Sequence, residues 1–92
     1  MRPLSEVIKD FLYSEARLDA RLAEQKLIAS WNGIMGPIIA KHTLGIYIYN
    51  KQLFVKVDSS VIRQELAYAK SQIVKSLNDH VGKKIIDQIV LQ

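Results

Sequence analysis

Two unlike halves of the sequence meet at the stretch WNGIMGPIIAKHT, residues 31–43. Before it, apolar residues recur at the three- and four-residue spacing of a helix, and after it they alternate as in a β-hairpin. Gly36-Pro37 interrupts the helical spacing, because proline cannot donate a backbone hydrogen bond. We therefore expect a helix to end near residue 34 and at most one further helical turn to follow Pro37. Trp31 lies in the apolar line of that helix, where we expect it to anchor the core.

The N-terminal third is predicted to be helical, in two pieces. Residues 4–13 have helical apolar spacing, and Tyr13-Ser14 is interpreted as a break after which Ser14 caps a second helix. The second helix is predicted from about residue 15 to 34, with Leu18 and Leu22 as the apolar line of its first half. We expect a single domain over residues 1–92, in which residues 1–14 include the short N-terminal helix.

A β-hairpin is predicted to follow, with Asn50-Lys51 as its two loop residues, because asparagine tolerates a positive φ in a tight primed turn. This register places aliphatic residues on one face, which we expect to join the core, and aromatic residues with a lysine on the other. The predicted aliphatic pairs are Leu44–Val57, Ile46–Val55 and Ile48–Leu53. The predicted pairs of the other face are Gly45–Lys56, Tyr47–Phe54 and Tyr49–Gln52.

The C-terminal part is predicted to be one long helix and a third strand. Asp58-Ser59-Ser60 supplies an N-cap, and Gly82 is a C-terminal stop for a helix that ends near Val81. Residues 83–91 are rich in β-branched side chains, which is typical of a strand. The order α-α-β-β-α-β predicts an α+β fold, with helices packed on a three-stranded sheet made of the hairpin and the C-terminal strand. The third strand is expected beside the first or second.

Composition excludes several classes of function. The 92 residues include no cysteine and no apolar run long enough for a membrane helix, so we expect a cytoplasmic protein without disulfides or a membrane partner. The two histidines stand far apart, and neither a metal-ligand cluster nor a phosphate-binding loop motif is present. We therefore expect no catalytic residue, no metal, no cofactor and no small-molecule substrate.

The net charge of +4 belongs to the second half of the sequence, because residues 1–40 hold five basic and five acidic side chains. Residues 41–92 hold eight basic and four acidic ones, an asymmetry that indicates a polyanionic or acidic partner. A helical wheel places Arg63 and Lys70 together on the long helix. The predicted phosphate contacts are Lys41, Lys51, Lys56, Arg63, Lys70, Lys83 and Lys84.

The aromatic side of the hairpin is a second candidate surface. Tyr47, Tyr49 and Phe54 could stack bases or contact a protein partner. Alternatively, the N-terminal helix or another copy of the chain covers them, with Leu4, Val7, Ile8 and Phe11 as the covering residues of the helix.

Two further motifs have a structural interpretation beside a functional one. Gly33-Ile34-Met35-Gly36 has the spacing of the backbone clamp of KH domains, but its apolar interior favours a helix end. His42 is interpreted as a residue that caps the preceding turn or binds the hairpin backbone, with a phosphate contact as the alternative.

Several of these motifs together resemble the DciA family. They are Trp31-x-x-Ile34-x-Gly36-x-x-Ile39-Ala40-x-His42-Thr43, the run Leu53-Phe54-Val55-Lys56-Val57-Asp58-Ser59-Ser60 with Leu66, and Ile85-x-x-x-Ile89. The resemblance covers roughly residues 20–91. It implies a KH-like fold in a bacterial protein, from a family long catalogued as a domain of unknown function, that binds DNA and acts with the DnaB-type replicative helicase. Longer relatives continue into a flexible tail, whereas this sequence ends at the third strand.

The sequence thus predicts a non-enzymatic, nucleic-acid-binding accessory protein that helps load or operate the replicative helicase through phosphate contacts without sequence specificity. Single-stranded or forked DNA and the helicase are the expected partners. The alternative is a protein–protein adaptor that does not contact nucleic acid directly.

Overall fold

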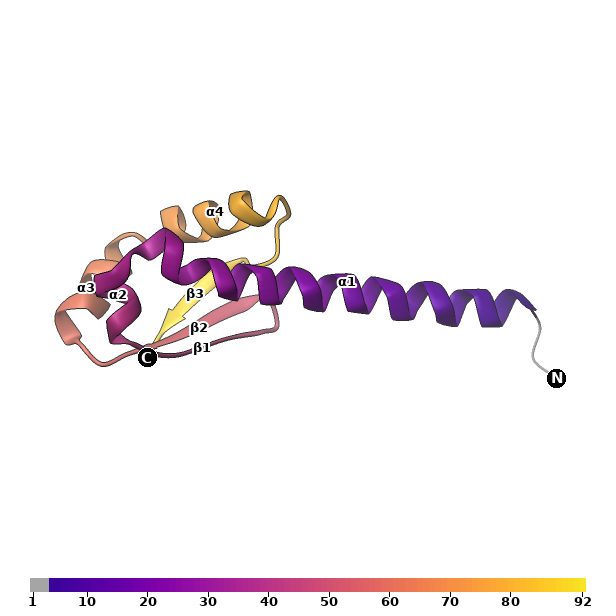
Figure 1. The fold of residues 1–92 in the computed structure, drawn as a ribbon, viewed down its shortest axis with the longest axis horizontal. Coiled ribbons are helices and arrows are strands. Elements are labelled where there is room, and N and C mark those ends of the chain that lie inside the picture. The colour runs from indigo at the N-terminus through magenta and orange to yellow at the C-terminus, as the bar shows by residue number, and fades with distance from the viewer. Residues whose placement is uncertain (1–3) are drawn as a thin grey trace.

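The computed structural model describes the backbone of residues 4–92 and the side chains of residues 18–92 (Figure 1). Its elements are α1 (Leu4–Met35), α2 (Pro37–His42), β1 (Thr43–Tyr49), β2 (Gln52–Val57), α3 (Ser60–Tyr68), α4 (Lys70–Val81) and β3 (Gln88–Leu91). The predicted α+β class and the order of helices and strands are confirmed, with the last helix in two parts.

The three strands form one sheet in the order β1-β2-β3, with β1 antiparallel to β2 and β3 parallel to β2. The crossover through α3 and α4 places β3 beside the second strand, one of its two predicted positions. Helices α1 and α4 pack on each other over one face of the sheet (Figure 1). The core between the helices and the sheet consists of Leu27, Trp31, Leu53, Val55, Val57, Leu66, Ile73, Leu77, Ile86 and Ile89.

Helix α1 is continuous, so the predicted break at Tyr13-Ser14 is wrong. Neither residue is a glycine or proline, and nothing local forces the backbone out of the helical conformation. The helix extends well beyond the sheet (Figure 1), and the molecule measures 60 × 21 × 19 Å along its principal axes. Leu18 and Leu22 are consequently 56% and 59% exposed rather than part of the core.

Helix α1 ends at the predicted place. Gly36 has a φ of 91°, a left-handed conformation that glycine adopts without steric cost, and Pro37 begins α2 at the position where a missing N–H costs nothing. Five residues before Gly36, Trp31 is 1% exposed, and its indole N–H donates to the Thr43 hydroxyl at 3.1 Å. The junction between the two halves of the sequence is therefore fixed by a core anchor.

The predicted hairpin register is confirmed from Tyr49–Gln52 to Gly45–Lys56. Asn50 and Lys51 both have positive φ, at 52° and 61°, as a type I′ turn requires. The outermost predicted pair is wrong, because Thr43 rather than Leu44 pairs with Val57. The register shifts between Thr43 and Gly45, which leaves Leu44 at a bulge and 60% exposed.

The predicted long helix is interrupted at Ala69, which has a φ of −112° and a ψ of 16°. Ser59 caps α3 as expected, accepting the Ile62 N–H at 3.3 Å. At the other end, Gly82 stops α4 as predicted, with a φ of 85°. The interruption lets α3 reach the ends of β2 and β3 while α4 follows α1.

The third strand is shorter than predicted, because residues 83–87 are irregular. The Asn78 side chain takes the place of a strand partner for this segment. Its oxygen accepts the N–H groups of Ile85 and Ile86 at 2.9 and 3.1 Å, and its amide donates to the Ile86 carbonyl at 2.9 Å. The segment thereby buries Ile86 completely without ladder hydrogen bonds.

Candidate nucleic-acid interface

The two faces of the sheet are chemically distinct. Strand alternation and register place one set of side chains toward α1 and α4, and this inner sheet face comprises Ile46, Ile48, Leu53, Val55, Val57, Ile89 and Leu91. The opposite, outer sheet face comprises Gly45, Tyr47, Tyr49, Gln52, Phe54, Lys56, Gln88 and Val90. Tyr47 and Tyr49 are 50% and 72% exposed, so this face is open to solvent at β1.

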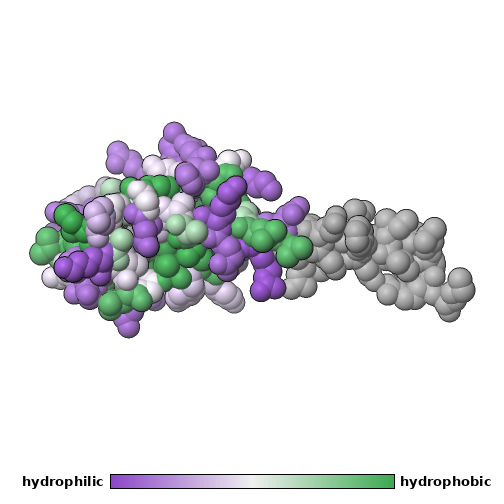
Figure 2. All heavy atoms as spheres, in the orientation of Figure 1, coloured by the Kyte–Doolittle hydropathy of each residue, from purple (hydrophilic) through white to green (hydrophobic). Residues whose placement is uncertain are grey.

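The side chains that the alternative interpretation placed over this face, those of Leu4, Val7, Ile8 and Phe11, lie outside the residues whose side chains the structure describes. Hydrophobic and hydrophilic side chains alternate over the face of the molecule seen in Figure 2.

Tyr47 and Phe54 form an aromatic stack across the hairpin. Their ring centroids are 4.8 Å apart and their planes differ by 7°. The separation equals the spacing between neighbouring strands, so the rings stand upright and face each other along the direction of the ladder. One ring face of Tyr47 therefore points past the free edge of β1.

Positive charge on the outer sheet face comes from Lys56. The three strands contain no other charged residue and no carboxylate. Lys51 stands in the hairpin turn at one end of β1, and Lys41 stands at the end of α2 beside the other. All three lysines are exposed. An approaching phosphate chain thus meets ammonium groups on and beside an aromatic face with no opposing acid within the strands.

The seven predicted phosphate contacts do not form a single patch. Lys51, Lys83 and Lys84 belong to one end of the sheet, where the Asp87 N–H donates to the Lys51 carbonyl at 2.8 Å. Lys70 lies near this same end, beside Asp87 and Gln88, whereas Lys41, Lys56 and Arg63 belong to the opposite half. Arg63 and Lys70 occupy different helices, because the break at Ala69 ends the helical wheel that placed them together.

The Arg63 side chain binds backbone oxygens of the protein itself. Its guanidinium donates to the Val57 carbonyl at 2.7 Å and to the Gln92 carbonyl at 3.2 Å, which ties α3 to the ends of two strands. Because these bonds fix its direction, a phosphate can use only its remaining donors.

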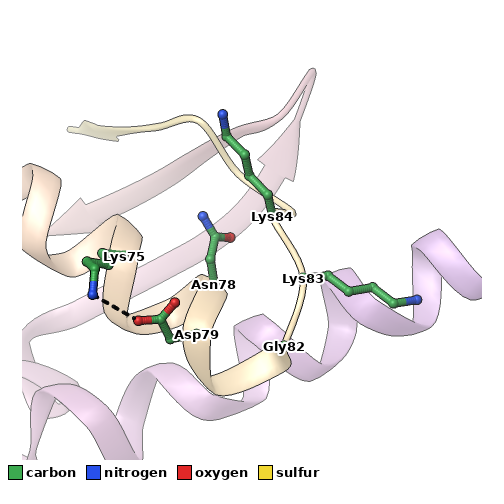
Figure 3. A pocket seen from close by; sticks show the side chains of 6 residues that line it. All are labelled: Lys75, Asn78, Asp79, Gly82, Lys83 and Lys84. Atoms are coloured by element: carbon green, nitrogen blue, oxygen red, sulfur yellow. Dashed lines mark hydrogen bonds and ion pairs between the residues drawn. The ribbon is translucent and has the colours of Figure 1, made fainter.

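The loop after Gly82 borders an open hollow of about 530 Å³ that is lined by Lys75, Asn78, Asp79, Gly82, Lys83 and Lys84 (Figure 3). The Lys75 ammonium pairs with Asp79 at 3.3 Å, and the Lys84 ammonium pairs with Asp87 at 3.5 Å. Lys83 extends over α1, away from Lys84 (Figure 3). Lys83 and Lys26 also line a second hollow with Asp19. The sequence did not single out Lys26, because the charges of residues 1–40 cancel.

The two remaining motifs are structural. His42 binds the Asp58 carboxylate through Nδ1 at 2.7 Å, and its carbonyl accepts the Asp58 N–H at 3.0 Å. His42 therefore joins the start of β1 to the end of β2, as its structural interpretation predicted. Its side chain does so through the Asp58 carboxylate rather than through the hairpin backbone. Gly33 and Gly36 stand at the end of α1, so their motif is a helix end as predicted.

Among the residues whose side chains are described, no cluster of acidic, histidine or cysteine side chains could hold a metal ion. Within the described chain, no helix is long and apolar enough to cross a membrane.

The sequence matches the model of one known protein family. The family described as "Dna[CI] antecedent, DciA" matches residues 3–91. The chain belongs to the DciA family. This is a family of helicase-loader and accessory proteins rather than of catalytic enzymes, and it is associated with loading of the DnaB helicase.

An uncharacterized protein of Borreliella burgdorferi is 33% identical to this DciA-family chain over 92 residues, which cover 98% of the chain and 92% of that protein. No solved structure matches the chain. The KH-like character that the resemblance implied accordingly stays a prediction.

Proposed function

We propose that this DciA-family protein binds DNA directly, through phosphate contacts without sequence specificity, and thereby helps load or operate the replicative DNA helicase. The observation that carries the proposal is the outer sheet face, which is open and aromatic and whose strands contain Lys56 but no carboxylate. Single-stranded or forked DNA is the expected ligand, because exposed aromatic rings contact unpaired bases better than stacked pairs.

The position of each basic residue determines how much we expect it to contribute to phosphate binding. Lys56 lies on the outer sheet face, and Lys41 and Lys51 flank it at the two ends of β1. Lys83 and Lys84 extend the charge at the hairpin end, where Asp87 already pairs with Lys84. Lys70 lies on α4 beside Asp87 at the same end, and Arg63 is largely occupied by carbonyl groups. We therefore assign the main phosphate contacts to Lys41, Lys51 and Lys56, with Lys70, Lys83, Lys84 and Arg63 as weaker contributors, because Lys83 extends over α1 rather than toward the outer sheet face.

Salt dependence tests the electrostatic mechanism. Binding of fluorescent single-stranded and forked oligonucleotides is measured by anisotropy across a range of salt concentrations. We expect the logarithm of affinity to fall linearly with the logarithm of salt concentration, by about 0.7 per phosphate contact for single strands. An affinity that does not change with salt would contradict phosphate binding.

A matched pair of lysine variants locates the contacts. Lys56→Gln removes a charge from the outer sheet face, whereas Lys75→Gln removes one from α4, which packs on the inner side. We expect Lys56→Gln alone to reduce the salt slope by about 0.7. Arg63 is unsuitable for this test, because its loss would also release the two carbonyl groups that it binds. If the two lysine variants changed the salt slope equally, the outer sheet face would be ruled out as the DNA-binding site.

The adaptor hypothesis uses the same surface, because exposed tyrosines also bury well against proteins. Nuclease-treated pull-down of the helicase, performed beside the DNA assay, separates the two functions. If Tyr49→Ala abolished helicase capture and DNA binding were undetectable in every variant, the protein would be an adaptor. If Lys56→Gln weakened DNA binding and left helicase capture intact, the DNA-binding proposal would stand.

A further inference from the structure

The two edges of the sheet differ in how they are protected. Strand β3 has only four residues, and Asp87, Lys70 and Lys84 lie close to its start. Strand β1 has seven residues, TLGIYIY, without a charge or a proline. Natural edge strands are usually short, charged or interrupted, because an exposed edge pairs readily with another strand. Apart from the bulge at Leu44, β1 has none of these protections.

The free hydrogen-bonding groups of β1 can be assigned from the hairpin. The type I′ turn bonds Tyr49 to Gln52, and the antiparallel alternation then directs the backbone groups of Tyr47 and Gly45 toward β2 as well. The N–H and C=O of Ile46 and Ile48 consequently point to the free edge. Within the described part of the chain, these groups have no hydrogen-bond partner.

We infer that β1 pairs with β1 of a second copy of this chain, antiparallel and with Tyr47 on the two-fold axis. In that register Ile46 of each copy exchanges backbone hydrogen bonds with Ile48 of the other. The two Tyr47 residues become a directly opposed pair without mutual hydrogen bonds, the closer of the two antiparallel arrangements. The interface is isologous, as a closed dimer requires.

Side chains complement this register at the centre and at both ends. The Phe54–Tyr47 stack already has the strand spacing of 4.8 Å, so a second Tyr47 adds the next ring of the same ladder. At each end, Lys51 of one copy arrives opposite Thr43 of the other. There the His42–Asp58 pair places a carboxylate that is 42% exposed. The result is a continuous six-stranded sheet with a doubled outer sheet face.

The pairing does not depend on the proposed DNA binding, and its salt dependence has the opposite sign. Each copy carries a net charge of +4, so salt screens the repulsion between copies and strengthens their association. DNA binding is weakened by salt. Dimerisation and DNA binding can therefore be refuted independently of each other.

The first test measures the dimer directly. Sedimentation equilibrium of the full chain, from micromolar to millimolar concentration and at two salt concentrations, is expected to detect a monomer–dimer equilibrium that salt favours. Tyr47→Lys places like charges on the axis and should raise the dissociation constant about tenfold or more. Val90→Lys adds the same charge to the outer sheet face at β3 and is the matched control, expected to dimerise like the parent chain. Equal dimerisation of the two variants would overturn the proposal.

The second test needs no substitution and so does not depend on a variant that folds. Amide hydrogen exchange is followed by NMR at low and high protein concentration. The Ile46 and Ile48 amides should gain protection as concentration rises, whereas amides in β3 should not. A dimer that leaves these two amides unprotected would place the interface elsewhere and refute the pairing. Protection that arises only when the helicase is added would assign the edge to that partner instead and refute it equally.

Discussion

The inner and outer faces of one small sheet differ sharply in burial. The inner sheet face includes Leu53 and Val55, both fully buried against the helices, whereas Tyr49 on the outer sheet face is 72% exposed. The two sets alternate along the same strands, so a single shift of register would exchange them. We therefore expect that stability and the proposed binding can be changed separately in this protein, and the predictions below compare the two faces and the segments around them.

The largest effect is expected beneath the inner sheet face. Trp31→Ala should lower the free energy of unfolding by about 3–5 kcal/mol, because it empties the centre of a small core and leaves the Thr43 hydroxyl without its donor. Tyr49→Ala should change it by about 0.5 kcal/mol or less, as surface substitutions usually do. Urea denaturation of both variants measures the difference. Similar losses would mean that the outer sheet face also carries stability.

The next effect concerns the segment that leads into β3. Asn78→Ala should cost about 1–3 kcal/mol, because the part-buried N–H groups of Ile85 and Ile86 lose their acceptor while Ile86 must stay buried. Asn78→Asp keeps the acceptor for both N–H groups, while its second oxygen faces the Ile86 carbonyl as another acceptor, so it should have a cost of its own but one smaller than that of Asn78→Ala. Thermal unfolding of the two variants ranks them. An aspartate variant as unstable as the alanine variant would contradict this role of the side-chain oxygen.

A smaller difference in stability is expected between alanine substitutions at two glycines. Gly82→Ala should destabilise by about 1–2 kcal/mol, because Gly82 has a φ of 85° and an alanine Cβ is strained there. Gly45 has no positive φ, and a Cβ added there meets no atom within 4 Å. Gly45→Ala should therefore be neutral or slightly stabilising in the same unfolding experiment. A loss at Gly45 equal to that at Gly82 would mean that the outer sheet face is crowded.

A smaller loss of stability than at Gly82 is expected at the aromatic stack. Tyr47→Leu should cost about 0.5–1.5 kcal/mol, the usual value of an aromatic pair, because Tyr47 is half exposed and its ring stacks on that of Phe54. Its affinity for single-stranded oligonucleotides should fall further, by about 1–3 kcal/mol of stacking per base. Anisotropy and urea denaturation of the same preparation compare the two losses. A variant that loses stability but no affinity would limit the stack to a structural role.

Short sequence motifs correctly predicted those features of the fold that depend on only a few neighbouring residues. The Gly36-Pro37 junction, the Asn50-Lys51 turn, the Ser59 cap and the Gly82 stop all depend on backbone preferences of neighbouring residues, and the structure has each of them. The prediction failed at Tyr13-Ser14, where a weak helix former was taken for a break. It also failed at Leu44, where a bulge moves one residue out of register.

What the sequence alone determined was therefore the order of elements, the hairpin register, the identity of Trp31 as a core residue and the resemblance to the DciA family. Only the tertiary structure decided how the charges are grouped, because the break at Ala69 separates Arg63 from Lys70, and the carbonyl groups of Val57 and Gln92 occupy Arg63. It also decided that β1 is a free edge, since the parallel pairing of β3 with β2 depends on a crossover whose end points are far apart in the chain. Alternation and capping act over a few residues and can be identified in sequence. The neighbours of a cation or of a sheet edge come from distant segments, and folding alone brings them together.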